Sequence, residues 1–143
     1  MRRMAKRAVH TVGLTRDAGF QIGVRRTLPV AADEAWDLVT SRRLVRRWLG
    51  AGRAFRLEEG ACYRLDDGST GEVRVVSPAS HVRLTMLRSG SSRPSTIQVR
   101  TIGKGDAAVV AFHEEHLPGP REREERRAHY TAVLDDLQNM LEG

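Results

Sequence analysis

The chain has 143 residues, a length typical of one domain with a sizeable hydrophobic core. Its single cysteine, Cys62, excludes an internal disulfide and suits a reducing compartment. No apolar run approaches the ~20 residues that a membrane-spanning helix requires, so we expect a cytoplasmic protein with no membrane partner.

The formal net charge of +6 is concentrated at the start of the chain. Arg2, Arg3, Lys6 and Arg7 supply four positive charges and the first ten residues contain no acid, which leaves +2 for the rest. We therefore expect a basic, flexible N-terminal arm over residues 1–17 and a single domain over residues 18–143. A body this weakly basic argues against nucleic acid as a partner.

The first predicted element is a strand over residues 20–28. Phe20, Ile22, Val24 and Leu28 alternate with polar or small residues, which is the period-2 pattern of a strand with one buried face. Arg26 falls on the apolar side. Its guanidinium either reaches water near the strand end or meets a carboxylate or a ligand in a cavity.

Two short helices are predicted next, over residues 32–40 and 42–49. The first directs Ala35, Trp36 and Val39 to one side. The second directs Leu44, Val45, Trp48 and Leu49 inward and leaves Arg42, Arg43, Arg46 and Arg47 outside. Residues opposite a buried stripe have to be polar, so these arginines form a solvated face or, alternatively, a patch for an acidic partner.

From Gly50 the chain reads as a meander of short strands separated by turn residues such as Asp67-Gly68. The predicted strands cover residues 53–57, 62–65, 71–76, 82–87, 96–102 and 107–115. Consecutive strands should pair antiparallel, because parallel pairing would need crossover helices that the pattern lacks.

The last predicted element is a long amphipathic helix over residues 121–141. Its apolar residues Tyr130, Val133, Leu134, Leu137, Met140 and Leu141 share one face at the helical period. On the opposite side we expect Glu122 and Arg126 to form an i,i+4 pair near the helix start. The whole pattern predicts an α+β fold in which a curved antiparallel sheet of about seven strands wraps on the C-terminal helix.

Several motifs in this order carry a family resemblance. Arg26 is followed ten residues later by Trp36, and then by Trp48-Leu49-Gly50. The segments 71–78 (GEVRVVSP), 81–85 (HVRLT), 109–117 and 121–137 continue the pattern. Over residues 20–141 the chain resembles the START/Bet v 1-like (SRPBCC) superfamily, in the branch named for the activator of the Hsp90 ATPase. The departures are Val30-Ala31, where the family commonly has Ala-Pro, and Thr85 and Tyr130, where it often has tryptophan.

The resemblance implies a helix-grip fold with a hydrophobic cavity between the sheet and the C-terminal helix. The expected ligand-binding residues are Arg26, Trp36, Trp48, Phe55, Tyr63, Leu84, Met86, Val99, Val109, Ala111, His113, Tyr130, Val133, Leu134 and Leu137, with Ile97 beside them. The alternative is that these residues pack against one another into a closed core.

His113 shares strand parity with Val109 and Ala111, so we expect it to point toward the helix, where it could orient a ligand. The other parity, Ala108, Val110 and Phe112, is also apolar, so that face could be covered by the N-terminal arm or by a second subunit in a homodimer. His113 and His116 lie on opposite faces of a strand, which argues against a metal site.

The sequence contains no phosphate loop, no GxSxG elbow and no cysteine set spaced for zinc, so we expect no cofactor and more readily a binding protein than an enzyme. The preferred hypothesis is a protein that holds a hydrophobic or amphipathic small molecule. The alternatives are a chaperone-associated interaction module that resembles Hsp90 activators, and a cyclase-like or hydrolase-like enzyme that uses the same cavity.

Overall fold

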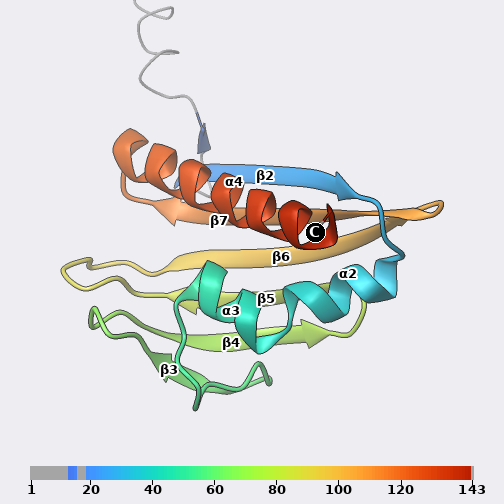
Figure 1. Cartoon of the computed structure of the whole chain (residues 1–143). Coiled ribbons are helices and arrows are strands. Elements are labelled where there is room, and N and C mark those ends of the chain that lie inside the picture. Colours follow the sequence, from blue (N-terminus) through green and yellow to red (C-terminus); the bar gives the residue numbers. More distant parts are fainter. Residues whose placement is uncertain (1–12, 16–18, 143) are drawn as a thin grey trace, which may run out of the picture.

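The computed structural model describes residues 13–15 and 19–142, which form one antiparallel sheet with three helices in front of it (Figure 1). The strands are β1 (Leu14–Thr15), β2 (Gly19–Leu28), β3 (Cys62–Arg64), β4 (Thr70–Ser77), β5 (His81–Met86), β6 (Ser95–Lys104) and β7 (Ala107–Leu117). The helices are α2 (Ala32–Val39), α3 (Arg42–Leu49) and α4 (Pro120–Glu142). The sheet order is β1-β2-β7-β6-β5-β4-β3, and every neighbouring pair is antiparallel.

The α+β architecture, the two short helices after the first long strand and the closing helix are confirmed. The strand predicted over residues 53–57 is wrong. Phe55 and Leu57 are half-buried against the core and Arg56 between them is exposed, which mimics a strand pattern. The backbone N–H of Phe55 instead bonds back to the Gly52 carbonyl at 3.2 Å, so the segment turns.

The seventh strand is β1, at the opposite edge of the sheet, where Leu14 pairs with Phe20. β1 falls within the segment that we expected to be an arm, residues 1–17. The rest of that segment, apart from Gly13, lies outside the described residues.

The two short helices are set by local signals. The Ser41 hydroxyl accepts a hydrogen bond from the backbone N–H of Leu44 at 3.3 Å and caps the start of α3. Gly50 ends α3 with a φ of 86°, a left-handed conformation that glycine adopts without steric cost. The Trp48 indole donates to the Val39 carbonyl at 2.9 Å, which fixes α3 against the end of α2.

Helix α4 crosses in front of β2 and β7, α2 packs against β6 and β7, and α3 contacts both α2 and α4 (Figure 1). The predicted stripe of α4 is buried at Tyr130, Val133, Leu134 and Leu137, which are all 0% exposed, and only partly buried at Met140 and Leu141. Helix α3 is joined to α4 by two contacts. Arg47 Nε lies 2.6 Å from Asp136 Oδ2, and the His129 ring is 2.9 Å from the Trp48 carbonyl.

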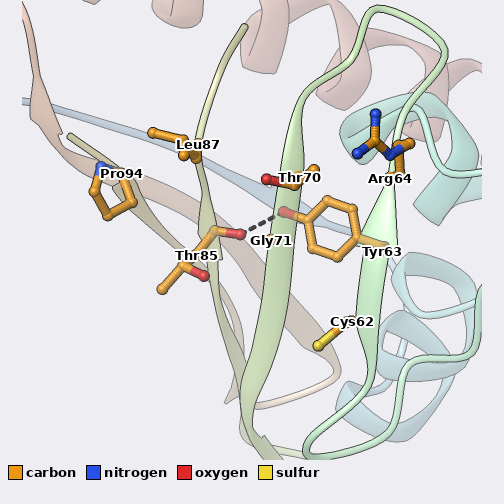
Figure 2. Close-up of a pocket in the computed structure, with 8 residues that line it drawn as sticks. All are labelled: Cys62, Tyr63, Arg64, Thr70, Gly71, Thr85, Leu87 and Pro94. Atoms are coloured by element: carbon orange, nitrogen blue, oxygen red, sulfur yellow. Dashed lines mark hydrogen bonds between the residues drawn. The ribbon is translucent and has the colours of Figure 1, made fainter. Parts of the chain in front are cut away.

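The ladder between β4 and β5 is interrupted where a side chain from β3 enters it. The backbone N–H of Glu72 donates to the Thr85 hydroxyl at 3.1 Å, and the Thr85 carbonyl accepts from the Tyr63 hydroxyl instead (Figure 2). The Tyr63 ring reaches Thr85 across Gly71, where an added Cβ would collide with both the ring and the Thr85 carbonyl. A glycine is therefore required at position 71.

We expect Gly71→Ala to destabilise the protein by about 1–3 kcal/mol, because the new methyl group must displace Tyr63 or separate the strands. Urea unfolding of the variant measures the loss. Gly52→Ala is the matched control, since no atom lies within 4 Å of a Cβ added there. Equal stability of the two variants would contradict this account of Tyr63.

Candidate functional site

The space beneath α4, where we expected a cavity, is occupied by large side chains. The Phe112 and Tyr130 rings stack with centroids 4.9 Å apart and an interplanar angle of 11°. Trp48 lies against the same Phe112 ring at 6.1 Å. All three side chains are almost fully buried. Within the described part of the chain, this region therefore matches the closed-core alternative.

Most of the predicted wall residues gather in this core. The buried ones are Trp48, Tyr63, Leu84, Met86, Ile97, Val99, Tyr130, Val133, Leu134 and Leu137. Trp36 and Phe55 pack against the core from its margin. Arg26 pairs with a carboxylate, since its Nη1 lies 2.5 Å from Asp135 Oδ1 of α4, but the pair is partly exposed and not in the expected cavity.

The predicted parity of β7 is wrong. Phe112 stacks on Tyr130, so the residues of its parity, including Ala108 and Val110, lie on the face of the sheet that the helices cover. Val109, Ala111 and His113 belong to the opposite face of the sheet, where the His113 ring lies 2.8 Å from the side-chain oxygen of Gln21. Because both parities of this strand are apolar, periodicity could not separate them. The apolar face that suggested a homodimer is the interior itself.

A buried carboxylate, Glu114, is the centre of a polar cluster on the inner face of β7. One carboxylate oxygen accepts hydrogen bonds from Arg126 Nε at 2.8 Å and from the Tyr130 hydroxyl at 2.7 Å. The other accepts from Arg88 Nη1 at 2.7 Å and from the Ser95 hydroxyl at 2.5 Å. Glu114 is 0% exposed. Because its partners come from α4 and from both sides of the β5–β6 turn, the cluster joins these segments.

These contacts control the charge state of the cluster. Burial by itself would raise the pKa of Glu114, but the positive charges of Arg126 and Arg88 outweigh burial and lower the pKa to about 2. Burial, and then the charge of Glu114, raise the pKa of the Tyr130 phenol, which therefore stays protonated and keeps donating. Both oxygens of Glu114 are thus satisfied, whereas Nη2 of Arg88 is buried without a hydrogen-bond partner among the described residues.

The sequence reading missed this cluster. Arg126 was expected to pair with Glu122 on the outer side of the helix, and that expectation is wrong because Arg126 turns inward to Glu114. One signal was present: Arg126 lies four residues before Tyr130 and so belongs to the buried stripe of α4. Glu114 likewise shares the parity of Phe112. Because burying an unpaired charge is costly, neither Glu114 nor Arg126 can be assigned to the interior until its oppositely charged partner is identified.

We expect Glu114→Gln to lower the free energy of unfolding by about 3 kcal/mol, because the substitution leaves two partly buried arginines without their counter-charge. The wild-type protein should lose the same contribution in acid. A carboxyl whose pKa is depressed on folding stabilises the fold above its unfolded pKa, here 4.5, and the contribution disappears as the pH falls through about 2.

Urea unfolding at pH 7 and a pH titration of unfolding check both statements. Glu125→Gln is the control, since Glu125 forms an exposed pair with Arg121 and should change stability by less than about 0.5 kcal/mol. A Glu114→Gln protein as stable as the control would contradict the assigned role.

An open hollow of about 440 Å³ lies between α3 and the segment that follows it, and we call it the α3 hollow. Its apolar lining consists of Val45, Ala51, Phe55 and Leu57. Its polar lining consists of Thr40, Arg42, Arg43, Arg46 and Arg53, with Gly52 completing the wall. Phe55 connects the hollow to the core, because its ring contacts Tyr63 edge-on at 5.4 Å.

A second hollow, of about 590 Å³, lies beside the interrupted ladder (Figure 2). It is lined by Cys62, Tyr63, Arg64, Thr70, Gly71, Thr85, Leu87 and Pro94. The Tyr63 hydroxyl is already engaged by the Thr85 carbonyl, and Arg64 is the one charged residue of this lining. The α3 hollow therefore offers the better combination of an apolar floor and charged groups.

Among the described residues, no three His, Cys, Asp or Glu side chains gather closely enough to hold a metal ion. In the same part of the chain, no helix combines the length and the apolar character needed to cross a membrane.

No known protein family and no curated protein matches the sequence. Solved structures do match the fold. DynU16, a protein from the dynemicin biosynthetic locus, superposes with a TM-score of 0.71 at 22% identity over 85% of this chain. CalU16 from Micromonospora echinospora gives a TM-score of 0.71 at 21% identity over 86% of this chain and 78% of its own.

An HSP90 activator from Plasmodium falciparum gives a TM-score of 0.68 at 16% identity over 85% of this chain and 95% of its own. The chain has the START/Bet v 1-like fold. It spans only 47% of DynU16. At identities this low the superpositions establish the shared fold alone, so the function of this chain has to be argued from its own residues.

Proposed function

We propose that the protein binds a small hydrophobic or amphipathic molecule, and that the ligand occupies the α3 hollow and not the filled space beneath α4. The observation that carries the proposal is the apolar floor of an open hollow of about 440 Å³. This volume falls within the ~300–1,000 Å³ of typical small-molecule sites.

The walls of the hollow are held in place from several directions. Val45 and Ala51 are nearly buried, at 5% and 4% exposure, and belong to the core cluster. Helix α3 is fixed to α2 through Trp48 and to α4 through Arg47. A preformed site of this kind loses little conformational entropy when a ligand enters.

Binding of the neutral dye Nile red tests the proposal. We expect saturable fluorescence enhancement and a raised melting temperature with the wild-type protein. Gly52→Trp should weaken binding about tenfold or more. A Cβ added at Gly52 has no atom within 4 Å, so the indole can enter the hollow and fill the space that the dye would occupy. Lys104→Trp, at the exposed end of β6, is the control that adds the same ring elsewhere. Dye binding unchanged by Gly52→Trp would refute the site.

A second candidate is docking of an acidic protein partner on α3, as the likeness to an HSP90 activator suggests. The specific observation is that Arg42, Arg43 and Arg46 are exposed and form no ion pair within the described residues. A pull-down with purified Hsp90 tests it: capture that is lost in Arg43→Glu/Arg46→Glu supports docking, and no capture by the wild type removes it. We do not propose an enzymatic role, because Glu114 and Tyr130 are engaged with each other and line none of the hollows described above.

A further inference from the structure

The four arginines around the α3 hollow differ from the other arginines near the helices. Arg47 is paired with Asp136, Arg26 with Asp135, and Arg126 with Glu114. Arg42, Arg43, Arg46 and Arg53 are exposed and make no ion pair within the described residues. The lining of the hollow contains no acidic residue. Four positive charges thus surround one apolar floor without a counter-charge from that lining.

The placement of these charges on α3 is unfavourable for the helix by itself. Arg42 and Arg43 occupy its first turn, which has no acidic residue, and so lie at the positive end of the helix dipole. Arg42 and Arg46 are four residues apart, a spacing at which like charges repel. An anion bound beside them would relieve both effects.

We infer that the natural ligand of the α3 hollow is a soluble amphiphile that carries a carboxylate, sulfate or phosphate group. This inference rests on the proposed function and adds the chemical class of the ligand. The apolar body contacts Val45, Ala51, Phe55 and Leu57, and the anionic group lies among the guanidinium groups at the rim. Guanidinium groups bind planar or tetrahedral oxyanions through paired N–H donors, which suits this arrangement.

Charge and floor have separate roles in this site. The rim arginines are exposed, so their attraction is screened by salt and selects anions without giving high affinity alone. The apolar floor supplies most of the affinity and does not discriminate between charged and neutral head groups. An inorganic anion, which gains nothing from the floor, should therefore bind much more weakly than an amphiphile.

Displacement of Nile red by two matched chains tests the inference. Decanoate and 1-decanol have the same number of carbons and differ in the charged group. At low salt we expect decanoate to displace the dye at about tenfold lower concentration than decanol. The preference should shrink toward equality at 0.5 M NaCl, where charges more than roughly 4 Å apart are largely screened.

The double variant Arg43→Gln/Arg46→Gln should abolish the preference for decanoate and leave decanol displacement unchanged. Arg25→Gln/Arg64→Gln is the matched control, because both arginines are exposed on other elements and the loss of net charge is the same. The control variant should keep the tenfold preference.

The outcomes separate this inference from the proposed function. If Nile red does not bind, the proposed function itself fails. If the dye binds but decanoate and decanol compete equally, or if Arg43→Gln/Arg46→Gln keeps the preference, binding stands and the anionic class is wrong. The inference is also overturned if the protein binds vesicles containing phosphatidylglycerol while decanoate fails to displace Nile red. The anion would then belong to a membrane surface.

Discussion

One buried carboxylate determines how this molecule is put together. Charges removed from water are tolerated only when their partners are close and their hydrogen bonds are made. Glu114 meets that condition by joining Arg126 of α4 to Arg88 beyond β5, with both of its oxygens occupied. The position of α4 on the sheet follows from this contact, and the stacked Phe112 and Tyr130 rings extend it along the helix. Helix α3 is then placed by its contacts to α4.

Because the interior beneath α4 is filled by side chains, the candidate binding site lies at the surface, in the α3 hollow. The molecule uses arginine in two distinct ways. Arg88 and Arg126 stabilise the fold, because both pair with the buried carboxylate of Glu114. Arg42, Arg43, Arg46 and Arg53 are exposed around an apolar floor, and the lining of that hollow holds no acid to match them. The same residue type thus contributes to stability in one place and remains free for recognition in another.

Sequence patterns predicted the elements better than the site. The stripe of α4 and the start of α3 at Ser41 follow from local rules, so helix positions could be read directly. Strand β7 could not be oriented, because Val109 and Val110 are both apolar and only the partner ring of Tyr130 chooses between the faces. The pairing of Glu114 with Arg88 and Arg126 joins segments 26 and 12 residues away and leaves no local pattern. The segment around Phe55 was predicted as a strand because alternating burial in a turn gives the same residue spacing as a strand.

The order of the strands also fixes the sequence of events during synthesis. Strands β3 to β6 each pair with the next strand along the chain, so this meander can assemble while the polypeptide is still growing. Strand β2 cannot take its place until β7 has emerged, since Arg26 pairs with Val110 across most of the domain. Ile22 and Leu28 therefore stay exposed to water until β7 has been made. A nascent chain with such an unpaired strand is open to self-association until β7 emerges.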